Sequence, residues 1–418
     1  GVAMEQIYDM IIIGGGPAGL AAAVAAYDAG VKDVLVLERE EEAGGVLKQC
    51  IHNGFGLTRF RENMTGPEYA QRFLDEARAR NIEILTGAFV VDLSSDKTVT
   101  YMNEKGVFTM RAGAVILAMG CRERSKGALN IAGTRPAGLF SAGTAQKFVN
   151  IYGLLPGKRV LILGSGDIGL IMARRLTLEG AEVLGVVEIM PCSSGLKRNI
   201  AQCLDDFGIP LYLRHTVVEI EGDDRVSGAL VAEVDENRFP IAGTEIHFDC
   251  DTILFSVGLI PENELTKKAG ISLHAGTRGA LVDSDRETEI EGIFACGNVL
   301  HVHDLVDFVS EEAEIAGRAA AKYLLGGHTQ KSYVPTRAGE NVSYVLPQKL
   351  CRGEKDAQKL NFRVRSAFPN AKIIVRAGDT VKEFRRIAVA PGEMEHVSLP
   401  PALFDGAENV EISVVREG

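Results

Sequence analysis

The sequence predicts an α/β protein that contains two copies of a strand–helix–strand unit, followed by a small all-β domain. Two observations carry this prediction. A strand that runs into a glycine-rich turn occurs twice, near residues 11 and 161. From about residue 333 onward, short segments alternate apolar and polar residues and are separated by turn-forming residues. A chain of 418 residues is long enough for two or three such domains.

The two copies agree in order and in spacing. Each begins with an apolar strand, 11–13 or 161–163, and continues into a G-x-G-x-x-G turn and a helical stretch that ends near Gly30 or Gly180. A second apolar strand follows and stops at an acid, Glu38 or Glu188. In both copies this acid lies 24 positions after the first glycine.

This arrangement meets the physical requirements of a dinucleotide site. The glycines permit a sharp turn, a close approach of the backbone to a pyrophosphate, and tight packing of helix on strand. The helix start presents N–H groups to the phosphate charge, and the acid accepts hydrogen bonds from a ribose. We therefore expect two Rossmann-like units, the alternative being two glycine-rich turns in an unrelated α/β fold.

The acid of the second copy bears on nucleotide choice. A carboxylate at the ribose repels a 2′-phosphate, so Glu188 favours NAD(H) over NADP(H). Lys197 and Arg198 follow downstream and could be phosphate ligands, but we interpret them as solvated surface charges.

Composition excludes several other classes of protein. A net charge of −11 argues against a nucleic-acid partner, because phosphate binding needs a clustered basic surface. The seven cysteines are scattered without a C-x-x-C pair, which favours a reducing cytoplasm and offers no zinc site. The sequence contains no apolar run of the roughly 18 residues that a membrane span needs. The apolar stretch near the N-terminus breaks at the first glycine turn, so we expect neither a signal peptide nor an anchor.

Over about the first 330 residues the chain resembles the flavoproteins with two dinucleotide-binding domains, the pyridine nucleotide-disulfide oxidoreductase superfamily that includes glutathione and thioredoxin reductases. The segment 115–120 is similar to that family's strand ending in A-T-G, with Met119 for Thr, and the segment 252–258 is similar to the strand that closes its NAD domain. The segment 292–299 resembles G-I-F-A-x-G-D, with Asn298 in place of the final Asp.

The resemblance implies FAD in the first unit and NAD in a second unit inserted within it. The expected domains are a FAD-binding domain in two parts (4–150 and 266–330), an NAD-binding domain (151–265) and a β-rich C-terminal domain (333–418). The helix that begins near Asp307 would point its N-terminus at the flavin, where a positive dipole end stabilises the reduced, anionic form. The expected FAD-binding residues are Gly14, Gly16, Pro17, Ala18, Gly19, Glu38, Gly45, Gln49, Ala118, Gly120, Gly297 and Asn298. The expected NAD-binding residues are Gly164, Gly166, Asp167, Ile168, Gly169, Glu188 and Gly258.

One departure from the family concerns the reaction class. Disulfide reductases of the superfamily carry two cysteines near the flavin, whereas the segment 44–54 holds a single cysteine, Cys50, and a histidine, His52. We therefore expect no relay through a flavin-proximal disulfide. The segment 137–146 resembles the flavoprotein subunits of hydrogen cyanide synthase, opine oxidase and sarcosine oxidase, which work in multi-subunit complexes. The segment 49–52 also looks like FAD proteins that accompany glycerol-3-phosphate dehydrogenase-like subunits.

Cys50 and His52 are the candidate catalytic residues. A thiol near a histidine can form a thiolate, and histidine titrates near neutral pH. The alternative is that Cys50 is a small core residue and that His52 caps a turn. A cluster of His301, His303, Asp304 and Asp307 could hold a metal, but we expect these residues to cap a helix and predict no metal site.

The predicted function is that of an FAD-dependent oxidoreductase that exchanges hydride with NAD(H). Its second reactant would be a small molecule or a partner flavoprotein, and the protein would be a cytoplasmic homo- or hetero-oligomer. The alternative function is a structural or electron-transfer component of a multi-subunit dehydrogenase, with a vestigial NAD site. The C-terminal domain is either a docking module for a partner or a lid over the chain's own FAD domain.

Overall fold

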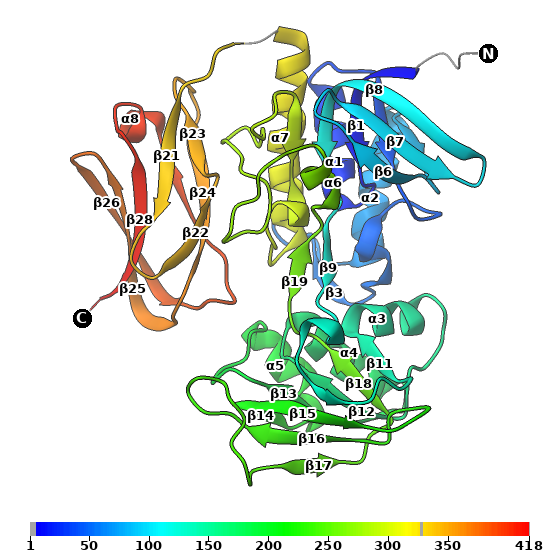
Figure 1. Ribbon diagram of the computed structural model, residues 1–418. Coiled ribbons are helices and arrows are strands. Elements are labelled where there is room, and N and C mark those ends of the chain that lie inside the picture. The colour runs from blue at the N-terminus through cyan, green and yellow to red at the C-terminus, as the bar shows by residue number, and fades with distance from the viewer. Residues whose placement is uncertain (1–5, 327–328, 418) are drawn as a thin grey trace. The chain divides into compact units, whose positions relative to one another are not determined.

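The computed structural model describes residues 6–326 and 329–417, and it divides into two compact units (Figure 1). The host unit combines the chain up to Cys121 with the chain from Pro261 onward, and the inserted unit is Arg122–Ile260. The inserted unit thus begins before the predicted boundary at residue 151. Its earlier start follows from strand β11 (Leu139–Ser141), which pairs with β18 (Thr252–Phe255). Helix α3 (Ala142–Asn150) also belongs to this unit, because it packs against α4 (Asp167–Leu178).

The host unit is built on a seven-stranded sheet with the order β5-β2-β1-β8-β7-β6, in which β20 also pairs with β8. Strands β5, β2, β1, β20 and the second half of β8 are parallel, whereas β6, β7 and the first half of β8 form an antiparallel meander. The strands are β1 (Gln6–Ile13), β2 (Val34–Leu37), β5 (Glu83–Leu85), β6 (Phe89–Leu93), β7 (Thr98–Asn103), β8 (Gly106–Leu117) and β20 (Ile293–Ala295). Strand β2 is buried along its whole length, as expected for a parallel strand covered on both faces.

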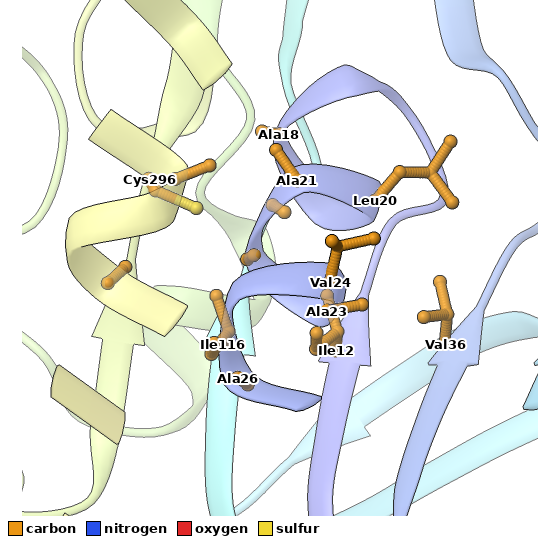
Figure 2. Close-up of a cluster of buried hydrophobic side chains, with 14 of the residues drawn as sticks. Ile12, Ala18, Leu20, Ala21, Ala23, Val24, Ala26, Val36, Ile116 and Cys296 are labelled. Atoms are coloured by element: carbon orange, nitrogen blue, oxygen red, sulfur yellow. The ribbon is translucent and has the colours of Figure 1, made fainter. Parts of the chain in front are cut away.

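Helices α1 (Pro17–Asp28) and α7 (Val306–Gly326) pack side by side against this sheet (Figure 1). Small residues allow their close approach, because a Cβ on Gly317 would lie only 2.3 Å from the carbonyl oxygen of Ala22. Figure 2 shows the alanines of α1 between Ile12 and Val36 of the sheet and Cys296, which is fully buried. The smaller elements of the host unit are η1 (Gly45–Gln49), β3 (Asn53–Phe55), β4 (Met64–Thr65), α2 (Gly66–Ala79), α6 (Glu264–Lys268) and η4 (Gly297–Val299).

The inserted unit repeats the same construction. Its parallel sheet has the order β11-β18-β12-β13-β14, and a second sheet has the order β10-β15-β16-β17. In the second sheet β10 is parallel to β15, whereas β15, β16 and β17 are antiparallel. The additional elements are β10 (Ala132–Gly133), β12 (Arg159–Leu163), α4 (Asp167–Leu178), β13 (Glu182–Glu188), α5 (Lys197–Cys203), η3 (Asp205–Phe207), β14 (Leu211–Leu213), β15 (His215–Glu221), β16 (Gly228–Glu233) and β17 (Ile246–Phe248). The chain enters and leaves through β9 (Cys121–Glu123) with η2 (Lys126–Ala128), and through β19 (Leu259–Pro261).

The C-terminal domain consists of a five-stranded sheet, β23-β21-β28-β25-β26, and a three-stranded sheet, β22-β24-β27. The predicted strands near 360–365, 372–376, 383–389 and 410–415 correspond to β24, β25, β26 and β28. The bounds are β21 (Tyr333–Ala338), β22 (Val342–Leu346), β23 (Lys349–Cys351), β24 (Gln358–Val364), β25 (Phe368–Ala377), β26 (Thr380–Val389), β27 (Glu395–Leu399), α8 (Pro401–Phe404) and β28 (Val410–Arg416). One pair, β21 with β28, is parallel.

This domain shares its core with the rest of the host unit. Tyr344 and Leu346 of β22 are buried in the same cluster as Val282 and Leu300, while Val345 points into the domain's own core. Backbone bonds support the contact, because Gln348 donates its N–H to Val282 at 3.1 Å. The packing therefore favours the expectation of a domain seated on its own chain.

Of the helices that the structure describes, none has the combination of length and apolar character that spanning a bilayer requires.

Candidate functional site

The two glycine turns adopt the same geometry. Gly14 has a φ of +109° and Gly164 a φ of +97°, in the region that favours glycine. A Cβ on Gly14 would lie 2.2 Å from the carbonyl oxygen of Ala118, and a Cβ on Gly164 would lie 2.1 Å from that of Ser256. The first glycine of each turn therefore allows its backbone to contact the end of the neighbouring strand. The helix that follows then begins at the carboxyl edge of the sheet.

The two acids close these turns in matching ways. Glu38 Oε2 accepts from the N–H of Gly15 at 2.9 Å, and its Oε1 accepts from the N–H of Glu40 at 2.9 Å. Glu188 Oε2 accepts from the N–H of Ser165 at 3.0 Å, and its Oε1 accepts from that of Met190 at 2.9 Å. The duplication seen in the sequence thus extends to single hydrogen bonds, and both carboxylates are buried at the edge where a ribose would lie.

The two helix starts differ in charge. In α1 the first turn holds Pro17 and no acid, and among the described residues no side chain caps this helix. In α4 the first turn holds Asp167, whose Oδ1 accepts from the N–H of Leu196 at 2.8 Å and from Nδ2 of Asn199 at 2.7 Å. The α1 start therefore remains open to a phosphate, whereas the α4 start is tied to the loop before α5.

Several predicted residues lie around the α1 turn. A Cβ on Gly16 would be 3.6 Å from the Cα of Gly45, and a Cβ on Gly297 would be 2.7 Å from the Cβ of Ala18. Three separated segments thus form a narrow, glycine-lined cradle at the carboxyl edge of the sheet. Such an edge is where open α/β sheets bind dinucleotides, so the residues present fit one. Gln49 ends η1 in the segment that follows Gly45.

Asn298 has a defined orientation in this cradle. Its Oδ1 accepts from the backbone N–H of His303 at 3.0 Å and lies 3.2 Å from Nδ1 of that ring. A backbone N–H needs an acceptor, so the amide oxygen faces His303. The Nδ2 group therefore faces the other way and donates to Cys121 Sγ at 3.6 Å.

Cys50 is placed differently from a reactive thiol. It follows η1, its Sγ donates to the carbonyl oxygen of Val46 at 3.3 Å, and it is 8% exposed. Burial raises the pKa of its thiol to about 12, so a thiolate is disfavoured at neutral pH. His52 is half-buried, and its ring lies 5.1 Å from that of Phe55. The structure therefore favours the core interpretation of Cys50 over the thiolate.

A buried ionic cluster beside Gly297 was not predicted from the sequence as such. Glu312 Oε1 accepts from the N–H of Gly297 at 3.0 Å, and its Oε2 lies 3.2 Å from Nε of Arg286 and 3.1 Å from Nε2 of His301. The Nε2 atom of His303 is 3.4 Å from Oε1. Burial alone would raise the pKa of Glu312, but the Arg286 guanidinium and the hydrogen bond from His301, which needs no charge on that ring, hold it well below its usual range. Of the features in the sequence, only the position of Glu312 in the helical pattern of α7 could have indicated that its side chain faces inward.

The expected helix-capping cluster divides in the structure. Asp307 accepts from the N–H groups of Gly56, Thr58 and Arg59 at 3.0, 2.7 and 3.1 Å, and Asp304 binds the C-terminal domain. Burial lowers the pKa of His301 to about 4, which keeps this ring neutral. His301, His303 and Glu312 have ligand atoms close enough together for a metal ion, but the Arg286 guanidinium already supplies the positive charge.

A second carboxylate cluster is filled by an ammonium group. Asp283, Asp285 and Cys351 are close enough to share a cation, yet Lys331 Nζ lies 3.1 and 2.8 Å from the two carboxylates. The same ammonium is 3.0 Å from Glu287. This cluster therefore joins Lys331, just before the C-terminal domain, to the segment between α6 and β20 of the host unit.

The family model described as pyridine nucleotide-disulphide oxidoreductase matches residues 8–322. The chain belongs to this family. The family implies flavin-dependent redox chemistry with FAD and a pyridine nucleotide, and it makes the protein an oxidoreductase. The match ends before the C-terminal domain.

The relatives that match this chain carry the names of different enzymes. An opine oxidase subunit of Agrobacterium tumefaciens is 25% identical over 340 residues, which cover 76% of this chain and 65% of that protein. The chain thus spans less than two thirds of the length of that relative. The glutamate synthase [NADPH] small chain of Mycobacterium tuberculosis is 26% identical over 359 residues, 78% of this chain and 69% of that one. Because one relative is named with NADPH, family membership leaves the choice between NAD and NADP open.

The fold of the family is also found in solved structures. The crystal structure of T. acidophilum thioredoxin reductase has a TM-score of 0.63 and 25% identity, and it covers 76% of this chain and 99% of that chain. The predicted α/β fold with Rossmann-like sheets and a separate strand-rich C-terminal region is therefore confirmed.

Proposed function

We propose that this family member is an FAD-dependent oxidoreductase that exchanges hydride with NAD(H), without a flavin-proximal disulfide. Its other reactant would be a small molecule or a partner flavoprotein. The observation that carries the proposal is the doubled pair of glycine turn and buried acid, Gly14 with Glu38 and Gly164 with Glu188.

FAD is assigned to the host unit because the first turn of α1 carries no acid, whereas the first turn of α4 carries Asp167. The N–H groups of α1 would bind the pyrophosphate, while Glu38 would accept from the adenosine ribose. When bound, the flavin supplies hydride acceptance and donation. The protein would supply alignment and exclusion of water.

NAD(H) is assigned to the inserted unit, with Glu188 as the discriminating group. Its buried negative charge would repel a 2′-phosphate. Lys197 and Arg198, which the sequence offered as phosphate ligands, are exposed at the start of α5, and we interpret them as solvated charges. This supports NAD(H) over NADP(H).

The cysteines support a reaction that uses no pair of thiols. Those that the structure describes are all thiols, and burial raises the pKa of Cys50 and of Cys296. A disulfide relay needs a thiolate to attack, and these thiols are protonated at neutral pH. The same thiols fit a reducing compartment, so we place the protein in the cytoplasm.

A second candidate is a component of a multi-subunit dehydrogenase whose nucleotide site in the inserted unit is vestigial. Asp167 supports it, because this carboxylate occupies the α4 start and binds Leu196 and Asn199 of its own chain. The similarity to a protein named as one of the subunits of opine oxidase also fits a role within a hetero-oligomer.

Anaerobic stopped-flow mixing with NADH or NADPH separates these candidates. We expect NADH to bleach the flavin absorbance of the purified protein much faster than NADPH does, and a Cys50→Ser variant to react at the same rate. A flavin that dithionite reduces but NADH leaves oxidised would contradict hydride exchange with NAD(H). Stable co-purification with a second flavoprotein would then support the role within a larger complex.

A further inference from the structure

Both faces of the three-stranded sheet of the C-terminal domain make contacts with other parts of the chain. Along β24 the buried residues Leu360, Phe362 and Val364 point into the domain's own core, as the twofold alternation of a strand requires. Lys359 and Arg363 therefore point outward. In an isolated domain this outer face would meet water, but here it meets the start of α7.

Arg363 makes the central contact of this face. Its Nη2 donates to Asp304 Oδ1 at 2.6 Å and to the carbonyl oxygen of Val302 at 2.9 Å. The other oxygen of Asp304 accepts from the backbone N–H of Met394 at 2.6 Å. The side chains of Arg363 and Asp304 are 17% and 18% exposed, so this pair is largely removed from water.

A second contact involves the first turns of α7 itself. Lys359 Nζ is 3.0 Å from Glu311 Oε2 and lies 4.9 Å from the centre of the Phe308 ring. The Phe308 ring in turn lies 6.2 Å from that of His396 on β27. The C-terminal domain therefore contacts residues 302–311, which we call the gripped segment.

The gripped segment belongs to the wall of the candidate flavin site. It follows η4, which begins at Gly297, and a Cβ on Gly297 would lie 2.7 Å from the Cβ of Ala18 in the first turn of α1. From inside the host unit, Asp307 holds the loop 56–59 and Glu312 holds the N–H of Gly297. The start of α7 thus joins the cradle to the C-terminal domain.

We propose that Arg363 is a positioning residue of the flavin site, which holds the α7 start in place and neutralises Asp304 from the C-terminal domain. This inference rests on the proposed function, because it requires FAD in the cradle of the host unit. It also assigns the C-terminal domain a role within the chain's own redox site.

Removal of the Arg363 guanidinium would change the charge near the bound cofactor. Without the guanidinium, the Asp304 carboxylate would stay largely buried and unpaired at the positive end of α7. An unpaired negative charge there opposes the negative charge of the reduced flavin, so the midpoint potential should become more negative. Loss of the grip on residues 302–304 should also weaken FAD binding.

The test compares FAD affinity and flavin midpoint potential in the full chain, measured by equilibrium titration of the apoprotein and by dye-linked anaerobic titration. We expect Arg363→Met to raise the Kd for FAD about tenfold and to shift the potential negative. The control is Lys372→Met, which removes a positive charge that lies 3.0 Å from Glu383 on the five-stranded sheet of the same domain. It should change neither quantity.

The double variant Arg363→Met/Asp304→Asn distinguishes positioning from simple loss of folding. Removing the carboxylate should return the potential to that of the wild type, whereas the FAD affinity should stay lowered because the contact of Arg363 with residues 302–304 is still missing. Failure of this rescue, or a single variant with unchanged Kd and potential, would overturn the proposal. A wild-type protein that takes up no FAD would instead contradict the proposed function itself.

Discussion

At the scale of single residues, we expect the acids that close the two glycine turns to select the ribose that each site accepts. Glu38 and Glu188 each use both carboxylate oxygens on backbone N–H groups, at distances of 2.9–3.0 Å. These bonds hold the carboxylates at the strand ends, where a ribose hydroxyl would approach. Such equivalence makes each acid a control for the other.

Replacement of Glu188 by Gln should reduce discrimination between the nicotinamide nucleotides. The amide is isosteric and neutral, so it repels a 2′-phosphate less, and it loses a charge-assisted bond of about 1.5–3 kcal/mol. We expect the KM for NADH to rise about tenfold while that for NADPH falls, measured by initial rates with an artificial acceptor. Glu38→Gln should instead weaken FAD binding with an unchanged nucleotide ratio. A Glu188→Gln variant that keeps the full preference for NADH would refute this role.

His301 should make the protein sensitive to acid. Burial, with His303 nearby, lowers its folded pKa to about 4 from an ordinary value of 6.5. A depressed pKa contributes stability above the unfolded value, and this stability is lost as pH falls from about 6.5 to about 4. We expect the free energy of unfolding to drop by up to about 3 kcal/mol across this window. His301→Asn should flatten the curve obtained by urea denaturation at several pH values, and an unchanged slope would contradict the assignment.

At the scale of secondary-structure elements, the sequence predicted what local pattern controls. The strands next to the glycine turns, the helices after them and four strands of the C-terminal domain lie where apolar periodicity places them. The buried cluster around Glu312 lay beyond such reasoning, because its partners Arg286 and His301 come from separate segments. Asp304 and Asp307 looked like one cluster in the sequence, but they face different neighbours.

The crossing of α1 and α7 gives a test at this scale. Alanine at Gly317 would place a Cβ 2.3 Å from the Ala22 carbonyl oxygen, whereas alanine at Gly326, the last residue of α7, meets open space. Alanine favours a helix by up to about 1 kcal/mol over glycine, so Gly326→Ala should be neutral or stabilising. Gly317→Ala should cost about 1–3 kcal/mol through forced separation of the helices. Urea unfolding of both variants checks this, and equal stabilities would exclude close packing as the cause.

At the scale of the whole molecule, the C-terminal domain is part of the host unit rather than an appendage. The sequence left open whether this domain docks a partner or covers its own chain, because alternation shows that a strand has two faces and does not show what covers the outer one. In the structure, the side chains of Tyr344 and Leu346 lie in the core of the host sheet. The side chain of Val345 between them lies in the core of the C-terminal domain itself.

Two neighbouring positions therefore test the shared core. Leu346→Ala should destabilise the protein by about 2–5 kcal/mol and accelerate amide exchange both in the C-terminal strands and around Ala280–Val282. Val345→Ala should accelerate exchange in the C-terminal strands alone. Hydrogen exchange followed by mass spectrometry resolves the two patterns. Confinement of the Leu346→Ala effect to the C-terminal strands would contradict a common core.

The inserted unit enters and leaves the host at adjacent points. In the host, the N–H of Glu262 donates to the carbonyl oxygen of Gly120 at 3.0 Å, and in the inserted unit Arg124 donates in the same way to Gly258 at 3.0 Å. Because exit and re-entry are neighbours, a short linker in place of residues 122–260 would leave the host sheet topologically complete. Gene rearrangement could thus exchange one nucleotide module for another without redesigning the scaffold that receives it, which makes this junction a natural point for building chimaeric reductases.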